Sequence, residues 1–226
     1  MFFRNFFFGR EATGRGTKRN RNKNQDRKAR RTAFQTSLRK ELRLEPLEPR
    51  QLLAINITYG VGNLAFADDA NFADNLSVDY NSGTDTYTIT TVAGNTFTDG
   101  TGGSVPSLVL GGGNTTATFL GTDVASLQVD SVGGADEVYV RGIADPLTVN
   151  AGSGADKIVV GDAANGLGGI QSTVTVSGDT DPSDVLDVKD SLNAGSRTYE
   201  VTSTTVGWGG GTQVTYATVE SLVLDA

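Results

Sequence analysis

The 226-residue sequence contains no cysteine and no histidine, and its only methionine is Met1. Disulfide bonds are therefore excluded. The missing side chains also exclude a Ser-His-Asp or Cys-His catalytic triad and any metal site built on histidine or cysteine. Carboxylate, hydroxyl and backbone carbonyl groups remain, and these oxygen ligands suit hard cations such as calcium.

Basic residues are scarce in the larger part of the chain. Residues 55–226 contain only 4 of them beside 21 acidic residues, which gives this part a net charge of −17. Residues 1–54 contain 15 basic and 5 acidic residues, a net charge of +10. A charge split of this size indicates a basic targeting segment or tail in front of an acidic domain.

Long apolar runs are absent as well. No stretch of the sequence approaches the roughly 20 apolar residues of a membrane-spanning helix. Residues 1–54 also lack the apolar run of about 7–15 residues of an ordinary secretory signal. The spacing of Phe34, Leu38 and Leu42 favours a helix over residues 26–43. Such a basic segment can bind nucleic acid, contact an anionic membrane, or remain a solvated tail.

The boundary between the two parts reads LEPLEPRQLLA over residues 44–54. Within it, the LEPR-XLL signature is matched at Leu47, Glu48, Pro49, Arg50, Leu52 and Leu53. The segment therefore resembles the N-terminus of the LEPR-XLL family of large exported bacterial proteins. The resemblance implies export to the cell surface or exterior, with the export machinery acting through residues 1–54. The small residue Ala54, at the change in composition, suggests cleavage nearby as a hypothesis.

The acidic part contains internal repeats. Residues 127–140 and 147–160 superpose at an offset of 20, with six of fourteen positions identical. Residues 174–188 form a third copy with one residue more in its turn. Each copy reads as a strand, a Gly-Asp turn and a second strand, and positions such as Leu127 and Val129 alternate with polar residues. Short repeats of this kind are typical of solenoids.

We therefore predict an all-β fold, a right-handed parallel β-helix, with the solenoid over residues 105–226. A hairpin array or β-sandwich could use the same alternation. Residues 55–104 are less regular and predict a cap, in which residues 75–91 form a β-hairpin. The phrase SLVLD at residues 221–225 resembles SLQVD at residues 126–130 and predicts a further coil, and the solenoid is expected to continue beyond this chain.

The Gly-Asp turns are similar to the calcium-binding nonapeptide GGxGxDxUx of RTX-type proteins. Residues 151–159 fit that pattern except at Ala151. The resemblance implies calcium held between neighbouring turns, and the candidate ligands are Asp130, Asp136, Asn150, Asp156 and Asp184. In contrast to the nine-residue family repeat, one such turn occurs per coil here. Alternatively, glycine and aspartate serve only as turn formers.

The predicted function is structural or adhesive and non-catalytic. Its expected partners are a cell-surface polysaccharide or neighbouring solenoid coils, whereas the negative charge disfavours nucleic acid. The alternative is a calcium-dependent carbohydrate-binding or carbohydrate-active β-helix, because tyrosine rings can stack on sugars and the acidic turns could supply paired carboxylates. A groove that gathers arginine, tyrosine and carboxylates would favour this alternative, and evenly stacked turns would favour a rod.

Overall fold

The computed structural model describes residues 53–68, 73–92, 95–164, 166–181, 183–191, 197–209 and 213–226. They belong to one compact unit, Gln51–Ala226. The predicted helix over residues 26–43 and the targeting motif up to Leu52 lie outside the described residues. Within the described ranges, no helix is long and apolar enough to cross a membrane.

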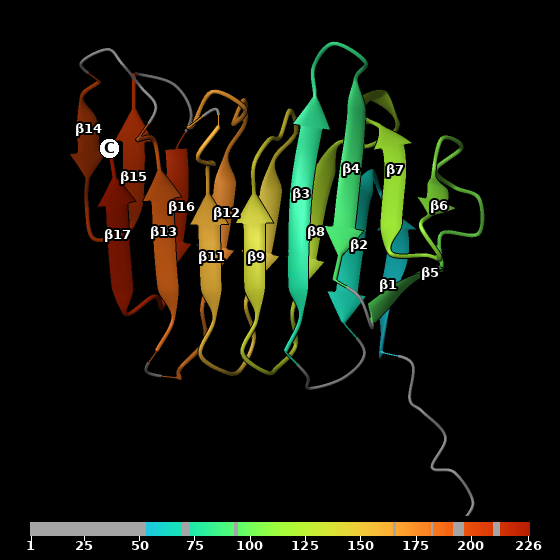
Figure 1. Ribbon diagram of the computed structural model, residues 1–226, viewed down its shortest axis with the longest axis horizontal. Coiled ribbons are helices and arrows are strands. Elements are labelled where there is room, and N and C mark those ends of the chain that lie inside the picture. Colours follow the sequence, from blue (N-terminus) through green and yellow to red (C-terminus); the bar gives the residue numbers. More distant parts are fainter. Residues whose placement is uncertain are drawn as a thin grey trace, which may run out of the picture. The chain divides into compact units, whose positions relative to one another are not determined.

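The described residues form two β-sheets that face each other as front and back layers (Figure 1). Sheet A has the order β14 (Tyr199–Val201), β15 (Thr205–Trp208), β16 (Gln213–Ala217), β12 (Val174–Ser177), β10 (Leu147–Asn150), β8 (Ser126–Asp130), β2 (Asn63–Asp68), β1 (Leu53–Gly60) and β5 (Asn95–Asp99). Sheet B has the order β17 (Ser221–Asp225), β13 (Val185–Lys189), β11 (Lys157–Val160), β9 (Glu137–Val140), β3 (Asn75–Asn81), β4 (Thr86–Thr91), β7 (Thr116–Leu120) and β6 (Val109–Gly111). The all-β prediction is confirmed.

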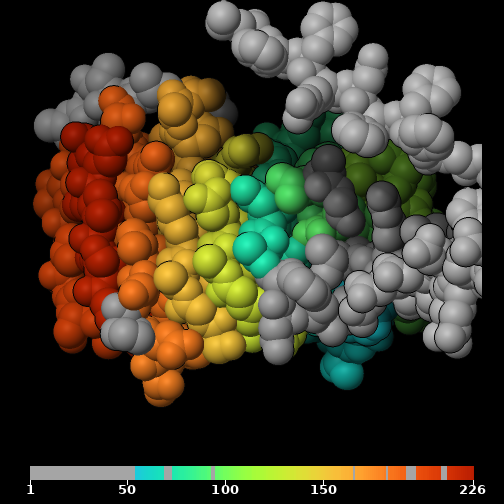
Figure 2. Space-filling view, turned by 60° about the horizontal axis from the view of Figure 1, so that its bottom comes forward, coloured from blue at the N-terminus to red at the C-terminus, as the bar shows by residue number. Residues whose placement is uncertain are grey.

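The central strands of both sheets pair in parallel, and the chain alternates between the sheets from β8 to β13. Leu147 lies opposite Leu127, as the offset of 20 predicts. The next repeat is offset by 27 residues in sheet A, where Val174 pairs with Leu147, and by 28 in sheet B, so the extra turn residue is also confirmed. Within one sheet, the strands of successive repeats lie side by side, and in Figure 2 they appear as adjacent bands from yellow to red.

Both sheets are mixed, because antiparallel strands flank the parallel ones. The predicted hairpin over residues 75–91 is present as β3 and β4, and β4 pairs in turn with β7. In the segment predicted as a cap, β2 pairs in parallel with β8, and β3 pairs in parallel with β9. At the other end, β14 and β15 precede β16 in antiparallel pairs.

One predicted repeat is wrong in its position. The phrase at residues 221–225 forms β17 and pairs with β13 in sheet B, whereas its relative at residues 126–130 forms β8 in sheet A. The repeat that contains β17 has β16 as its sheet A strand, with Val214 opposite Val174. The antiparallel strands β14 and β15 are inserted before β16. Strands of both sheets alternate apolar and polar residues, so alternation alone does not identify the sheet.

The core lies between the sheets and is built from alternating side chains. Leu127, Val129 and Val149 are buried, while the residues between them are half-buried. Tyr87 is buried near the first strands and stacks on Phe119 at 5.2 Å. Its hydroxyl accepts hydrogen bonds from the backbone N–H groups of residues 144 and 145, both at 2.8 Å. This contact ties the antiparallel β4 to a loop of the parallel region.

Candidate functional site

An acidic residue stands directly before each sheet B strand of the parallel region, and from Asp136 onward its carboxylate accepts a hydrogen bond from the backbone of the preceding acidic residue. The backbone N–H of Asp74 donates to Asp136 Oδ1 at 2.6 Å. The N–H of Asp136 donates to Asp156 Oδ1 at 2.8 Å, and that of Asp156 to Asp184 Oδ1 at 3.0 Å. Asp184 N–H donates to Glu220 Oε2 at 2.9 Å. We call these five residues the acidic ladder.

The backbone of the ladder residues joins neighbouring turns as well. The carbonyl of Asp136 accepts from Lys157 N–H at 2.8 Å, and that of Asp156 accepts from Val185 N–H at 2.8 Å. Glycine permits this close approach, because a Cβ on Gly154 would lie 1.5 Å from the carbonyl oxygen of the preceding turn. The Gly-Asp pattern therefore has a structural role here, in which glycine provides space and aspartate provides the bond between turns.

The four aspartates of the ladder are buried, whereas Glu220 is exposed. Asp136 and Asp156 are each 2% exposed, and the Oδ2 atom of each is buried and accepts no hydrogen bond. The pKa of Asp136 is raised from 3.8 to about 7, chiefly by burial and also by the charges of Asp156 and Asp74, although the hydrogen bond from the backbone of Asp74 acts to lower it. Burial likewise raises the pKa of Asp156 to about 6. The raised pKa favours the protonated form of Asp136 below about pH 7.

The described basic side chains pair elsewhere. Arg141 contacts Asp79 at 3.4 Å, Lys157 and Lys189 both contact Asp187, and Arg197 contacts Asp190 at 2.8 Å. Of the ion pairs described here, none involves Asp136, Asp156 or Asp184. The ladder thus keeps its acidic character along its length.

The structure separates the predicted calcium ligands into two places. Asp136, Asp156 and Asp184 belong to the buried ladder, with one carboxylate per turn. Asp130 and Asn150 lie in register at the ends of β8 and β10, where Asn150 Nδ2 donates to Asp130 Oδ1 at 2.6 Å. Across the described ranges, no group of three or more acidic residues could hold a metal ion.

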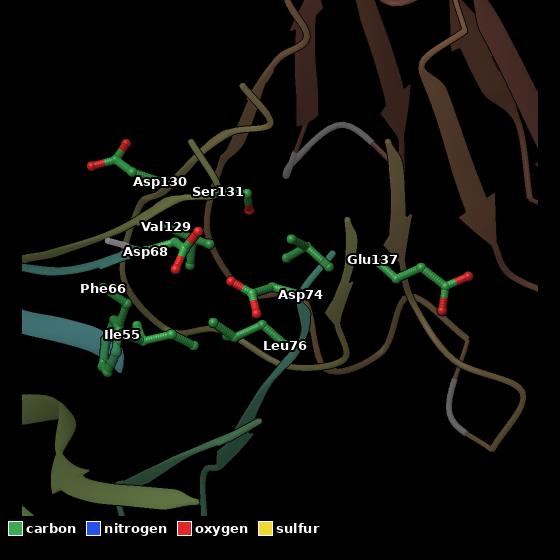
Figure 3. A pocket seen from close by; sticks show the side chains of 10 residues that line it. Ile55, Phe66, Asp68, Asp74, Leu76, Val129, Asp130, Ser131 and Glu137 are labelled. Atoms are coloured by element: carbon green, nitrogen blue, oxygen red, sulfur yellow. The ribbon is translucent and has the colours of Figure 1, made fainter. Parts of the chain in front are cut away.

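A small cavity lies between the sheets near the first ladder residue (Figure 3). Its volume is about 10 Å³, which is roughly the space that one water molecule needs. Asp68 and Asp74 point into it, whereas Asp130 and Glu137 point away. Asn95 Nδ2 donates a short hydrogen bond to Asp74 Oδ1. Two buried carboxylates, those of Asp68 and Asp74, therefore line the cavity at the start of the ladder.

The sequence interpretation missed Asp74 and Glu220 as ladder members. The signal lay in the position rather than in the turn motif, because each ladder residue directly precedes the first residue of a sheet B strand. Asp74 stands before Asn75 as Asp136 stands before Glu137, and these two strand residues are paired in register. Neither Asp74 nor Glu220 follows a glycine-rich turn, so the Gly-Asp pattern does not include them.

A second candidate site is open to solvent, at the outward-facing residues of sheet B. We call it the Arg141 groove. One depression of about 600 Å³ is lined by Asp79, Tyr80, Asn81, Ser82, Arg141, Gly142, Asp162, Gly168, Gly169 and Gln171. An adjoining depression of about 380 Å³ is lined by Tyr139, Arg141, Val159, Gly161, Asp162, Ala163, Ala164 and Lys189. The guanidinium of Arg141 lies 5.5 Å from the centre of the Tyr139 ring.

The two sites differ in kind. The acidic ladder is internal and links successive turns, whereas the Arg141 groove is shallow and combines hydrogen-bond donors, acceptors and an aromatic ring. No protein-family model, no curated protein and no solved structure matches the chain. The geometry of the two sites is therefore the basis for assigning their roles.

Proposed function

We propose that this chain is an exported cell-surface or extracellular protein and that its acidic part is a β-solenoid with a structural or adhesive, non-catalytic role. The acidic ladder is the observation that carries the proposal. The same bond joins each turn to the next from Asp74 to Glu220. A repeated contact between nearest neighbours is what stabilises a stack of coils.

The export part of the proposal rests on the resemblance of residues 47–53 to the LEPR-XLL signature. In this proposal the export machinery acts through residues 1–54. Ala54 lies in β1 opposite Thr96. If a protease cleaves the chain next to Ala54, it must do so before β1 pairs with β5. A strand that is already paired in a sheet cannot enter a protease active site as an extended, unpaired segment.

Fractionation of the cells that produce the protein tests the export proposal. We expect the wild-type protein in the envelope or medium, and we expect a variant with Leu47→Asp and Arg50→Glu to stay in the cytosol. Gln51→Ala is the matched control, because residue 51 is the free position of the signature. Wild-type protein found only in the cytosol would refute export, and mass spectrometry of the exported form locates any cleavage.

The second candidate function is calcium-dependent carbohydrate binding or a carbohydrate-active enzyme. The Arg141 groove favours it, since arginine, tyrosine and carboxylates gather there. Binding that vanishes with a calcium chelator would support the calcium-dependent form. Release of reducing or unsaturated ends from a polysaccharide would support catalysis and contradict the non-catalytic proposal.

A further inference from the structure

The two depressions of the Arg141 groove adjoin and share Arg141 and Asp162. Their volumes of about 600 and 380 Å³ fall within the usual range of ligand sites. Gly169, which lines the groove, packs closely against the backbone of Arg141, because a Cβ there would lie 2.5 Å from the carbonyl oxygen of Arg141. A shallow track made of two connected depressions suits a polymer that passes along the surface.

The groove has balanced charges within a strongly acidic domain. Arg141 and Lys189 line it, and they are two of only four basic residues after Ala54. Arg141 and Asp79 are 42% and 41% exposed and meet in a single contact of 3.4 Å. An exposed ion pair of this kind contributes little stability, so both groups can exchange it for bonds to a ligand.

From this geometry we propose that the Arg141 groove binds a neutral, hydroxyl-rich polysaccharide chain. Neighbouring sugar hydroxyls both donate and accept hydrogen bonds. The guanidinium of Arg141 offers a fixed fork of donors, and Asp79 offers two acceptor oxygens. The ring of Tyr139 beside Arg141 provides a flat surface for the apolar face of a sugar.

Charged ligands fit this site less well. A polyanion would be repelled by the net charge of −17 carried by residues 55–226. A cation would meet Arg141 and Lys189. The inference deepens the adhesive part of the proposed function and depends on it only for the biological setting, because binding can be measured without export.

Affinity electrophoresis of the full chain tests the proposal, with gels that contain glycogen, galactomannan or hydroxyethylcellulose and an alginate gel as the acidic probe. We expect retardation by at least one neutral polysaccharide. Arg141→Ala and Tyr139→Ala should each weaken binding by roughly tenfold, as the loss of a charge-assisted or stacking contact predicts. Lys157→Ala is the matched control, because this residue projects from sheet B beside the groove but does not line it.

Thermal unfolding of each variant identifies any loss of binding that is due to misfolding. Arg141→Lys is a second, milder variant, because lysine keeps the positive charge but lacks the planar guanidinium with its paired donors. The proposal would be overturned by the absence of retardation in every neutral gel, by retardation in alginate alone, or by equal effects of Lys157→Ala and Arg141→Ala. None of these outcomes bears on the cell fractionation, so failure of the binding site and failure of export are distinguishable.

Discussion

The acidic ladder predicts that the protein loses stability as pH rises through neutrality, and Asp136→Asn should remove much of this loss. Asp136 Oδ1 accepts from Asp74 N–H, and its buried Oδ2 accepts no hydrogen bond. Asparagine keeps the acceptor oxygen and cannot ionise. The variant therefore resembles the protonated acid at every pH.

The sign follows from the raised pKa. The folded protein holds the Asp136 proton up to about pH 7, whereas the ordinary pKa is 3.8. The stabilising contribution is therefore complete below about pH 3.8 and is lost as pH rises through 7. The full difference corresponds to about 4 kcal/mol. Relaxation of the turn and entry of water when the charge forms reduce the expected loss to about 2 kcal/mol.

Urea unfolding of the full chain at a series of pH values between about 4.5 and 8 measures the effect. We expect Asp136→Asn to equal the wild type at the acidic end and to exceed it by about 2 kcal/mol at the alkaline end. Some slope should persist in the variant, because the pKa of Asp156 is also raised, to about 6. Asp225→Asn removes the same charge from an exposed position and should leave the slope unchanged.

Two results would refute the reasoning. A wild-type free energy of unfolding that stays constant or increases between pH 5 and 8 would mean that the ladder acids ionise without cost. Equal pH profiles for Asp136→Asn and Asp225→Asn would mean that the effect comes from net charge rather than from the buried carboxylate.

Three further predictions concern the same fold. Tyr87→Phe should lower the free energy of unfolding by about 1–3 kcal/mol, because two backbone N–H groups lose their acceptor; an unchanged value in urea unfolding would contradict this. Gly154→Ala should destabilise by more than about 3 kcal/mol, because φ is +146° and the Cβ would overlap a carbonyl, whereas Gly102→Ala, with no atom within 4 Å, should cost about 1 kcal/mol. Millimolar calcium should leave the thermal midpoint unchanged, because the ladder carboxylates already accept hydrogen bonds from backbone N–H groups, and a rise would instead reveal calcium binding to the native state.

The register of the central strands was predictable from the sequence. Residues 127–140 and 147–160 are alike at positions that set both the strand and the turn, so equal offsets lead to parallel pairs such as Leu127 with Leu147. The hairpin of β3 and β4 was predictable because apolar alternation on both sides encloses Asn81 and Gly83, which favour turns. These features depend on local residues and short repeats.

Other features depend on contacts that local sequence does not specify. The antiparallel β14 and β15 displace the sheet A strand of the last turn to Val214, and no repeat announces this insertion. The turn motif identified Asp136, Asp156 and Asp184 as a column but not the hydrogen bonds that their carboxylates accept from backbone N–H groups. The Arg141 groove unites residues 79, 139 and 162 from separate turns, so only the packed sheets bring them together.

The bonds of the acidic ladder all run in one direction along the chain. Each turn donates its N–H to a carboxylate that the following turn supplies, from Asp74 to Glu220. A backbone N–H of one turn therefore has its acceptor only when the turn that follows it in the chain is in place. Each added turn both extends the sheets and completes the hydrogen bonding of its predecessor.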